Sequence, residues 1–92
     1  MKANDDFIFV IDPDDDLFIL PLADLAQVRI LFIHEYNEFQ LCYMSAKLND
    51  YYILYSSKDE DEVLMARNEL YDAILKKKFA VDFSQSGWIR EN

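Results

Sequence analysis

The residues that could do chemistry begin with an acidic stretch near the N-terminus. Asp12, Asp14 and Asp16 have the one-three-five spacing that oxygen ligands take in a calcium-binding loop. The sixth position of that pattern is Leu17 rather than glycine, and the twelfth is Ala23 rather than glutamate. Because the sharp turn and the bidentate ligand are both missing, the stretch is predicted to be an acidic turn and not a metal site.

His34 and Cys42 are the other pair with catalytic potential, as a base and a nucleophile. A two-residue hairpin turn at Asn37-Glu38 would place His34 opposite Leu41, so that Cys42 points to the other face of the sheet. A dyad is therefore not expected, and Cys42 is predicted to be a small core residue. The sequence also lacks a glycine-rich phosphate loop and a cluster of metal ligands. We expect a non-enzymatic protein that needs no cofactor.

Apolar runs and turn residues predict the strands that carry these side chains. Phe7 to Ile11 and Leu17 to Leu22 are short runs rich in β-formers, and the aspartates between them favour a hairpin. Pro21 has no N–H to donate, so the second strand is expected to lie at a sheet edge or to end there. Three further strands are predicted at Val28 to Tyr36, Phe39 to Lys47 and Tyr51 to Ser56. Since Gly87 is the sole glycine, asparagine and aspartate must supply any positive φ that the turns require.

The stretch from Ser57 to Lys78 is predicted to be an amphipathic helix. Ser57 and Glu60 have the spacing of a capping box. Acidic residues 59–62 would fill the first turn and Lys76 to Lys78 the last, which is the arrangement that the helix dipole favours. The apolar face consists of Val63, Ala66, Leu70, Ala73 and Ile74. Arg67 falls within this stripe and is expected to reach solvent or to pair with a carboxylate.

Beyond the helix, Phe79, Val81 and Phe83 alternate with polar or small residues and predict one last short strand. Residues 1–92 are too few to divide into two cores, so we expect a single domain. The predicted fold class is α+β: an antiparallel meander sheet of about five or six strands with one long amphipathic C-terminal helix packed on it.

Both faces of this sheet are predicted to be apolar. One face would carry Leu31, Ile33, Cys42, Met44, Ala46, Ile53 and Tyr55. The other would carry Val28, Ile30, Phe32, Phe39, Leu41, Tyr43, Tyr52 and Leu54. One helix covers one face, so the second needs the N-terminal hairpin, the C-terminal tail or another copy of the chain. The last of these alternatives motivates a homodimer hypothesis.

The composition indicates which cellular compartment and which classes of binding partner to expect. The formal net charge is −9, from 18 Asp and Glu against 9 Lys and Arg. This balance opposes direct binding to nucleic acid or to anionic membrane and favours a basic partner. A single cysteine, no apolar signal core and no run of about 20 apolar residues favour a cytoplasmic protein.

The carboxylates themselves are the strongest functional signal. Alternate strand residues lie about 6.6 Å apart and helix residues i and i+4 about 6 Å apart, steps that approximate the spacing of phosphates along one DNA strand. A dimer would carry twice −9, or −18, which matches about 31 Å of duplex, or some nine base pairs. The candidate partner-binding residues are Asp12, Asp14, Asp15, Asp16, Glu35, Glu38, Asp59, Asp61, Glu62, Glu69 and Asp72.

The length, the acid clusters at 12–16 and 59–62, and a β-rich body with one long helix resemble the small DNA-mimic anti-restriction proteins of T-even phages. The Arn type, which blocks the McrBC class of modification-dependent restriction enzymes, is the most similar. The resemblance implies a dimer whose carboxylates stand in for phosphates and occupy the DNA site of a restriction or other defence protein. The alternative is an acidic immunity or antitoxin protein that blocks one toxin through aromatic anchors such as Tyr51, Tyr52, Tyr55 and Trp88.

Overall fold

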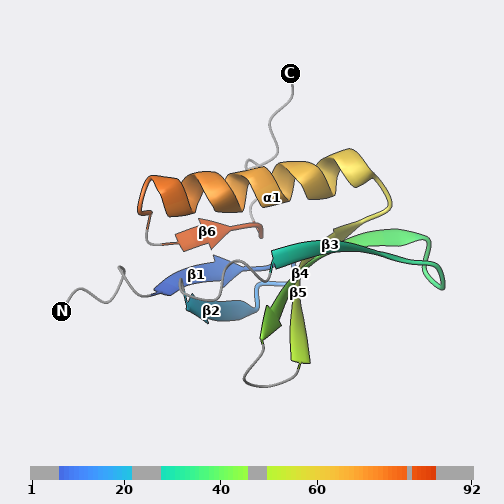
Figure 1. The fold of residues 1–92 in the computed structure, drawn as a ribbon, viewed down its shortest axis with the longest axis horizontal. Helices are drawn as coiled ribbons and strands as arrows, with labels where there is room; N and C mark the ends of the chain where they lie inside the picture. The colour runs from blue at the N-terminus through green and yellow to red at the C-terminus, as the bar shows by residue number, and fades with distance from the viewer. Residues whose placement is uncertain (1–6, 22–27, 46–49, 79, 85–92) are drawn as a thin grey trace.

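The computed structural model describes residues 7–21, 28–45, 50–78 and 80–84. Six strands and one helix follow one another along these residues (Figure 1). In chain order they are β1 (Phe7–Ile11), β2 (Leu17–Pro21), β3 (Val28–Ile33), β4 (Glu38–Ser45), β5 (Asp50–Ser57), α1 (Glu60–Leu75) and β6 (Ala80–Asp82). The α+β class is therefore confirmed.

The strands form two three-stranded sheets rather than the single meander that we predicted. One sheet has the order β2-β1-β6, in which β1 pairs antiparallel with β2 and parallel with β6. The other is the antiparallel meander β3-β4-β5. The prediction failed because it paired only neighbours in sequence, whereas the free edge of β1 takes a strand from beyond the helix. The predicted N-terminal hairpin is correct, and Pro21 ends β2 at the edge of its sheet.

The β3–β4 connection is longer than the two-residue turn predicted at Asn37-Glu38. Ile33 pairs with Glu38, which leaves residues 34–37 as the turn. This register differs from the expected one by an even number of residues, so β3 and β4 present the predicted faces. Asn37 has φ of 51° and Asp15 has φ of 69°, as expected of residues that replace glycine in turns.

A bulge in β5 corrects the predicted position of Tyr55. Cys42 pairs with Ile53 but Leu41 pairs with Tyr55, so Leu54 is the extra residue on β5. Tyr55 consequently shares a face with Leu41 instead of Cys42. Both Leu54 and Tyr55 are buried, which a regular strand with one covered face would not allow.

The helix begins later than predicted and uses a different cap. Asp59 is the N-cap, and its carboxylate accepts a hydrogen bond from the Asp61 N–H at 3.0 Å. Ser57 therefore makes no capping box with Glu60. Its hydroxyl instead accepts from the Asp59 N–H at 3.0 Å and donates to Glu62 at 3.3 Å.

The helix ends at Leu75, so the three lysines that we placed in its last turn follow it. The Lys78 N–H bonds to the Ala73 carbonyl at 2.8 Å and the Lys77 N–H to the Ile74 carbonyl at 3.1 Å. These two bonds form a Schellman motif, with Lys77 at φ of 55° in the position that glycine usually takes.

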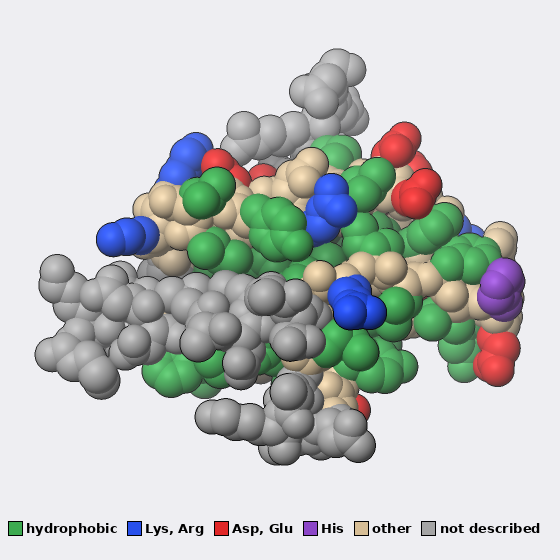
Figure 2. Space-filling model, in the orientation of Figure 1, with side chains coloured by type: hydrophobic (Ala, Val, Ile, Leu, Met, Phe, Trp, Pro, Cys, Tyr) green, Lys and Arg blue, Asp and Glu red, His purple; other side chains and the backbone are tan. Residues whose placement is uncertain are grey.

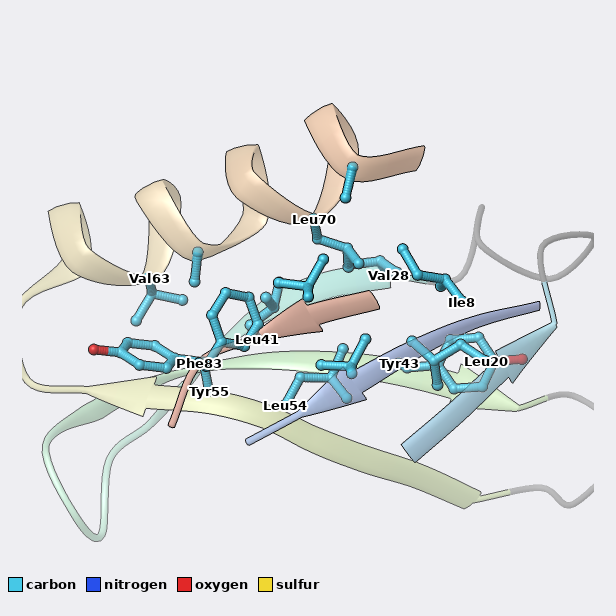
Figure 3. Close-up of a cluster of buried hydrophobic side chains, with 14 residues drawn as sticks. Ile8, Leu20, Val28, Leu41, Tyr43, Leu54, Tyr55, Val63, Leu70 and Phe83 are labelled. Atoms are coloured by element: carbon cyan, nitrogen blue, oxygen red, sulfur yellow. The ribbon is translucent and has the colours of Figure 1, made fainter. Parts of the chain in front are cut away.

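One core lies between α1 and both sheets (Figure 3). The helix contacts β4, β5 and β6, and buries the predicted positions Val63, Ala66, Leu70 and Ala73. Its sheet partners are Ile8, Val10, Leu20, Val28, Leu41, Tyr43, Leu54, Tyr55, Val81 and Phe83. No helix in the described part of the chain is long and apolar enough to cross a membrane.

Candidate functional site

The fold brings the two acidic clusters of the sequence to the same end of β4. Residues 12–16 follow β1, and their turn forms one wall of a cleft that Glu38, the first residue of β4, also lines. Phe39, the next residue of β4, pairs with Ser57 at the end of β5, just before α1 begins. We call residues 12–16 the turn cluster, residues 59–62 the helix-start cluster, and the cleft between the turn cluster and Glu38 the acidic junction.

The backbone of the turn cluster holds one carboxylate inward and leaves three outward. The Asp12 carboxylate accepts hydrogen bonds from the N–H groups of Asp14 and Asp16, both at 2.9 Å, and Asp12 is only 8% exposed. Asp14, Asp15 and Asp16 are exposed. Asp12 therefore shapes the turn, and the other three carboxylates face solvent.

The helix-start cluster divides in the same way. Asp59 caps the helix, while Asp61 and Glu60 are exposed to solvent. Glu62 turns toward the sheet and accepts a hydrogen bond from the Tyr55 hydroxyl at 2.9 Å. Burial, and then the hydrogen bond and negative charge of Glu62, raise the pKa of Tyr55 from 10.0 to about 12. Glu62 thus fixes the start of α1 to β5.

The remaining candidate acids lie apart from one another. Glu35 is exposed in the β3–β4 turn, and Glu69 lies half-buried on α1. Asp72 forms ion pairs with Lys76 at 3.3 Å and Lys78 at 4.0 Å near the end of the helix. These exposed pairs offset the charge of Asp72 in part, so it attracts a basic partner less than the acids without a neighbouring lysine.

Charge is therefore distributed unevenly along α1. Acidic side chains gather over the start of the helix and basic ones over its end (Figure 2). The helix has 16 residues, so the two ends are about 24 Å apart. Within the described ranges, Asp72 is the only acid within ion-pair distance of a lysine or arginine. The acidic junction thus keeps its charge.

A cleft of about 370 Å³ opens at the acidic junction. Asp12 and Asp14 line one side of it, and Glu38 and Gln40 of β4 line another. Ile53, Leu54 and Tyr55 supply apolar surface from β5. Gln40 is only 7% exposed, and its side-chain Oε1 has no hydrogen-bond partner among the described residues. A buried polar atom left in this state destabilises the free protein.

The sequence did not single out Gln40, which lines the cleft, nor Glu60 and Asp82, two acids outside it. Glu60 belongs to the helix-start cluster, and Asp82 pairs in register with Ile11 at the start of the turn cluster. Its carboxylate accepts from the Ser84 N–H at 2.9 Å. A four-residue acidic run in the sequence signalled Glu60. No sequence signal marked the other two, because the pairing of β1 with β6 fixes the position of Asp82 and the approach of the turn to β4 encloses Gln40.

His34 and Cys42 are not brought together. His34 is exposed in the β3–β4 turn, with its ring 4.8 Å from that of Phe32. Cys42 is fully buried and pairs with Arg29. It lies four residues along β4 from Glu38, or about 13 Å, and Glu38 pairs with Ile33, the residue before His34. Burial raises the pKa of the Cys42 thiol to about 11. The described residues contain no group of three or more His, Cys, Asp or Glu that could hold a metal ion.

An apolar face remains exposed on the β1–β2 hairpin. Ile8, Val10 and Leu20 point into the core, so the alternate residues of both strands point outward. Among these, Phe7 is 40% exposed, Leu17 59% and Ile19 56%. Phe9 pairs with Ile19 and Ile11 with Leu17, so these side chains form one surface, which we call the hairpin face.

Arg67 lies over an aromatic ring rather than against a carboxylate. Its Cζ is 5.9 Å from the centre of the Tyr71 ring, and its buried Nε has no hydrogen-bond partner in the part of the chain that the structure describes.

Comparison with protein families, curated proteins and solved structures found no match to this chain.

Proposed function

We propose that this protein is a non-enzymatic inhibitor whose carboxylates occupy the DNA-binding surface of a basic protein. The observation that carries the proposal is the acidic junction. The turn cluster and Glu38, which are far apart in sequence, line one cleft there, and within the described ranges no lysine or arginine lies within ion-pair distance of their carboxylates. A surface of this kind attracts cationic side chains and repels nucleic acid.

Charge density limits the form that this mimicry takes. A net charge of −9 corresponds to about 15 Å of duplex at one charge per 1.7 Å. A single chain therefore matches the charge of about four or five base pairs. Concentrating the carboxylates in the two clusters raises the local density toward that of DNA, which a uniform distribution over the whole surface would not do. The turn cluster, the helix-start cluster and Glu38, rather than the whole molecule, are the parts that replace phosphates.

A homodimer extends the proposal. The hairpin face is apolar and exposed on one side of the β2-β1-β6 sheet, and it differs from the meander-sheet face on which the sequence motivated a homodimer. Joining two copies through it would double the number of acidic junctions. The target class suggested by the sequence resemblance is a modification-dependent restriction enzyme of the McrBC class, or another DNA-binding defence protein.

The test is a competition experiment. The tagged protein is used to capture partners from bacterial lysate at low and high salt, with and without added duplex DNA, and captured nucleases are assayed for DNA cleavage. We expect capture of a basic protein at low salt, loss at high salt, and displacement by DNA. Neutralising Asp14, Asp15, Asp61 and Glu60 to their amides should weaken capture in steps. Capture that is insensitive to both salt and DNA would exclude a mimic.

Exposed aromatic side chains favour the second candidate, an immunity or antitoxin protein specific for one toxin. Tyr36 is 62% exposed, Tyr51 43% and Phe32 39%. Aromatic anchors of this kind dominate tight, specific interfaces. This alternative predicts that Tyr36→Ala and Tyr51→Ala reduce partner binding more than Asp14→Asn or Asp61→Asn does, whereas the mimic predicts the reverse order.

A further inference from the structure

We infer that the cleft at the acidic junction is a recognition pocket for an arginine side chain of the protein partner. This inference deepens the proposed function by naming the group that a basic partner places there. It rests on two independent observations, the carboxylates that line the cleft and the unpartnered buried oxygen of Gln40.

The lining of the cleft selects a cation. Asp12, Asp14 and Glu38 contribute carboxylates, and none of the described residues that line the cleft is a lysine or arginine. Hydrogen bonds within the turn occupy one oxygen of Asp12, whereas the exposed Asp14 and the half-exposed Glu38 form no ion pair with a described base. Their negative charge is available to a ligand that enters from solvent.

Gln40 indicates a donor-rich ligand. Its amide is at the tip of a side chain that stands out from β4 on the same face as Glu38, two residues earlier. The Oε1 atom is closed to solvent and has no partner, so a rotation of the amide toward the cleft would let an entering donor satisfy an acceptor that is otherwise unsatisfied. An acceptor of this kind adds specificity that a field of surface carboxylates does not have.

Arginine fits these acceptors better than lysine. A guanidinium presents five N–H donors in a planar fork and sheds water more readily than an ammonium. It can therefore donate to more than one acceptor of the cleft at once, while its flat face lies against the exposed Ile53. The volume of about 370 Å³ is at the lower end of the range for small-ligand pockets, about 300–1,000 Å³.

The test uses a small probe in place of the partner. N-acetyl-arginine amide is titrated into the ¹⁵N-labelled protein, with the neutral, nearly isosteric N-acetyl-citrulline amide in parallel. We expect saturable shifts of the Gln40 side-chain amide and the Asp14 and Glu38 backbone amides with the arginine probe only. Equal shifts with citrulline, or non-saturating shifts at every exposed acid, would overturn the inference.

Variants separate the pocket from general attraction. Gln40→Leu and Glu38→Gln should each weaken arginine binding about tenfold, since each removes a hydrogen bond to a charged group. Glu69→Gln is the matched control on α1, and should leave the titration unchanged. Gln40→Leu should also raise the urea midpoint of the free protein, because it removes an unsatisfied buried oxygen. A lower midpoint together with unchanged binding would assign Gln40 a structural role and reject the pocket.

The probe keeps this inference distinct from the proposed function. If a DNA-displaceable partner is captured but the arginine probe does not bind, the pocket is rejected and the mimic stands. If the probe binds in the cleft but no partner is displaced by DNA, the pocket stands and the mimic is rejected.

Discussion

Single residues at the acidic junction have separate roles, and Tyr55 shows this most clearly. Its raised pKa means that the folded state binds the phenolic proton more tightly than the unfolded chain does. The stabilisation is complete below pH 10 and is lost as the pH rises toward the folded-state pKa of about 12. The wild-type protein should therefore lose stability over this alkaline interval.

Tyr55→Phe tests this expectation because it keeps the ring and removes the titrating hydroxyl. At neutral pH the variant should lose about 1 kcal/mol, since Glu62 loses a hydrogen-bond donor. Between pH 10 and 12 its stability should fall less steeply than that of the wild type. Urea denaturation at a series of pH values measures both effects. Tyr36→Phe, at an exposed position, is the control. If all three proteins show the same alkaline slope, another group is responsible.

At the scale of single residues, the sequence indicated which residues are candidates for binding but not how each side chain is buried or oriented. The acidic candidates were identified by composition, and most are exposed as expected. Gln40 was not identified, because a lone glutamine in an apolar strand carries no sign of what will pack over it. Tyr55 was placed on the wrong face because one extra residue in β5 reverses the alternation, and no glycine or proline marks that bulge.

At the scale of elements, the end of α1 offers a test of backbone strain. Lys77 adopts a left-handed conformation, which is unfavourable for a residue with a Cβ and natural for glycine. Lys77→Gly should raise the free energy of unfolding by about 0.5–1 kcal/mol, as measured by urea denaturation. Lys76→Gly, where φ is −88°, should instead lower it by about 0.5–1 kcal/mol. A destabilised Lys77→Gly variant would show that the lysine side chain contributes more than the strain removes.

Elements were predictable where the signal is local and unpredictable where it is not. The hairpin, the three-strand meander, the helix and the last strand were each recognised from periodicity and turn residues. The helix start was misplaced by two residues or so because Ser57 and Asp59 are both good caps, and the choice depends on Glu62 contacting β5. The split into two sheets depends on β6 pairing with β1, a contact between the two ends of the chain.

At the scale of the whole molecule, the fold separates two kinds of surface. The helix and the inner faces of both sheets enclose the core, the acidic junction collects carboxylates from the turn after β1 and from β4, and the hairpin face keeps apolar side chains on the outer side of β1 and β2. The two exposed surfaces differ in chemistry. Raising the salt concentration should weaken binding of a basic partner at the acidic junction and strengthen association of two chains through the hairpin face. Salt screens the attraction of the acidic junction to a basic partner, and it also screens the repulsion between two chains of the same charge.

This opposition gives the last prediction, which concerns the homodimer. Light scattering after size exclusion should give twice the mass of one chain at micromolar concentration, and the dimer should strengthen as salt is raised, because each copy carries −9 and association buries apolar surface. Ile19→Lys, which places a charge in the hairpin face, should yield a monomer of unchanged fold. Leu75→Lys, at an 82% exposed position at the end of α1, should remain a dimer. A wild-type protein that is monomeric at both salt concentrations would contradict the homodimer. The hairpin face would then be open to contact with the partner, and the mimic would present the charge of one chain only.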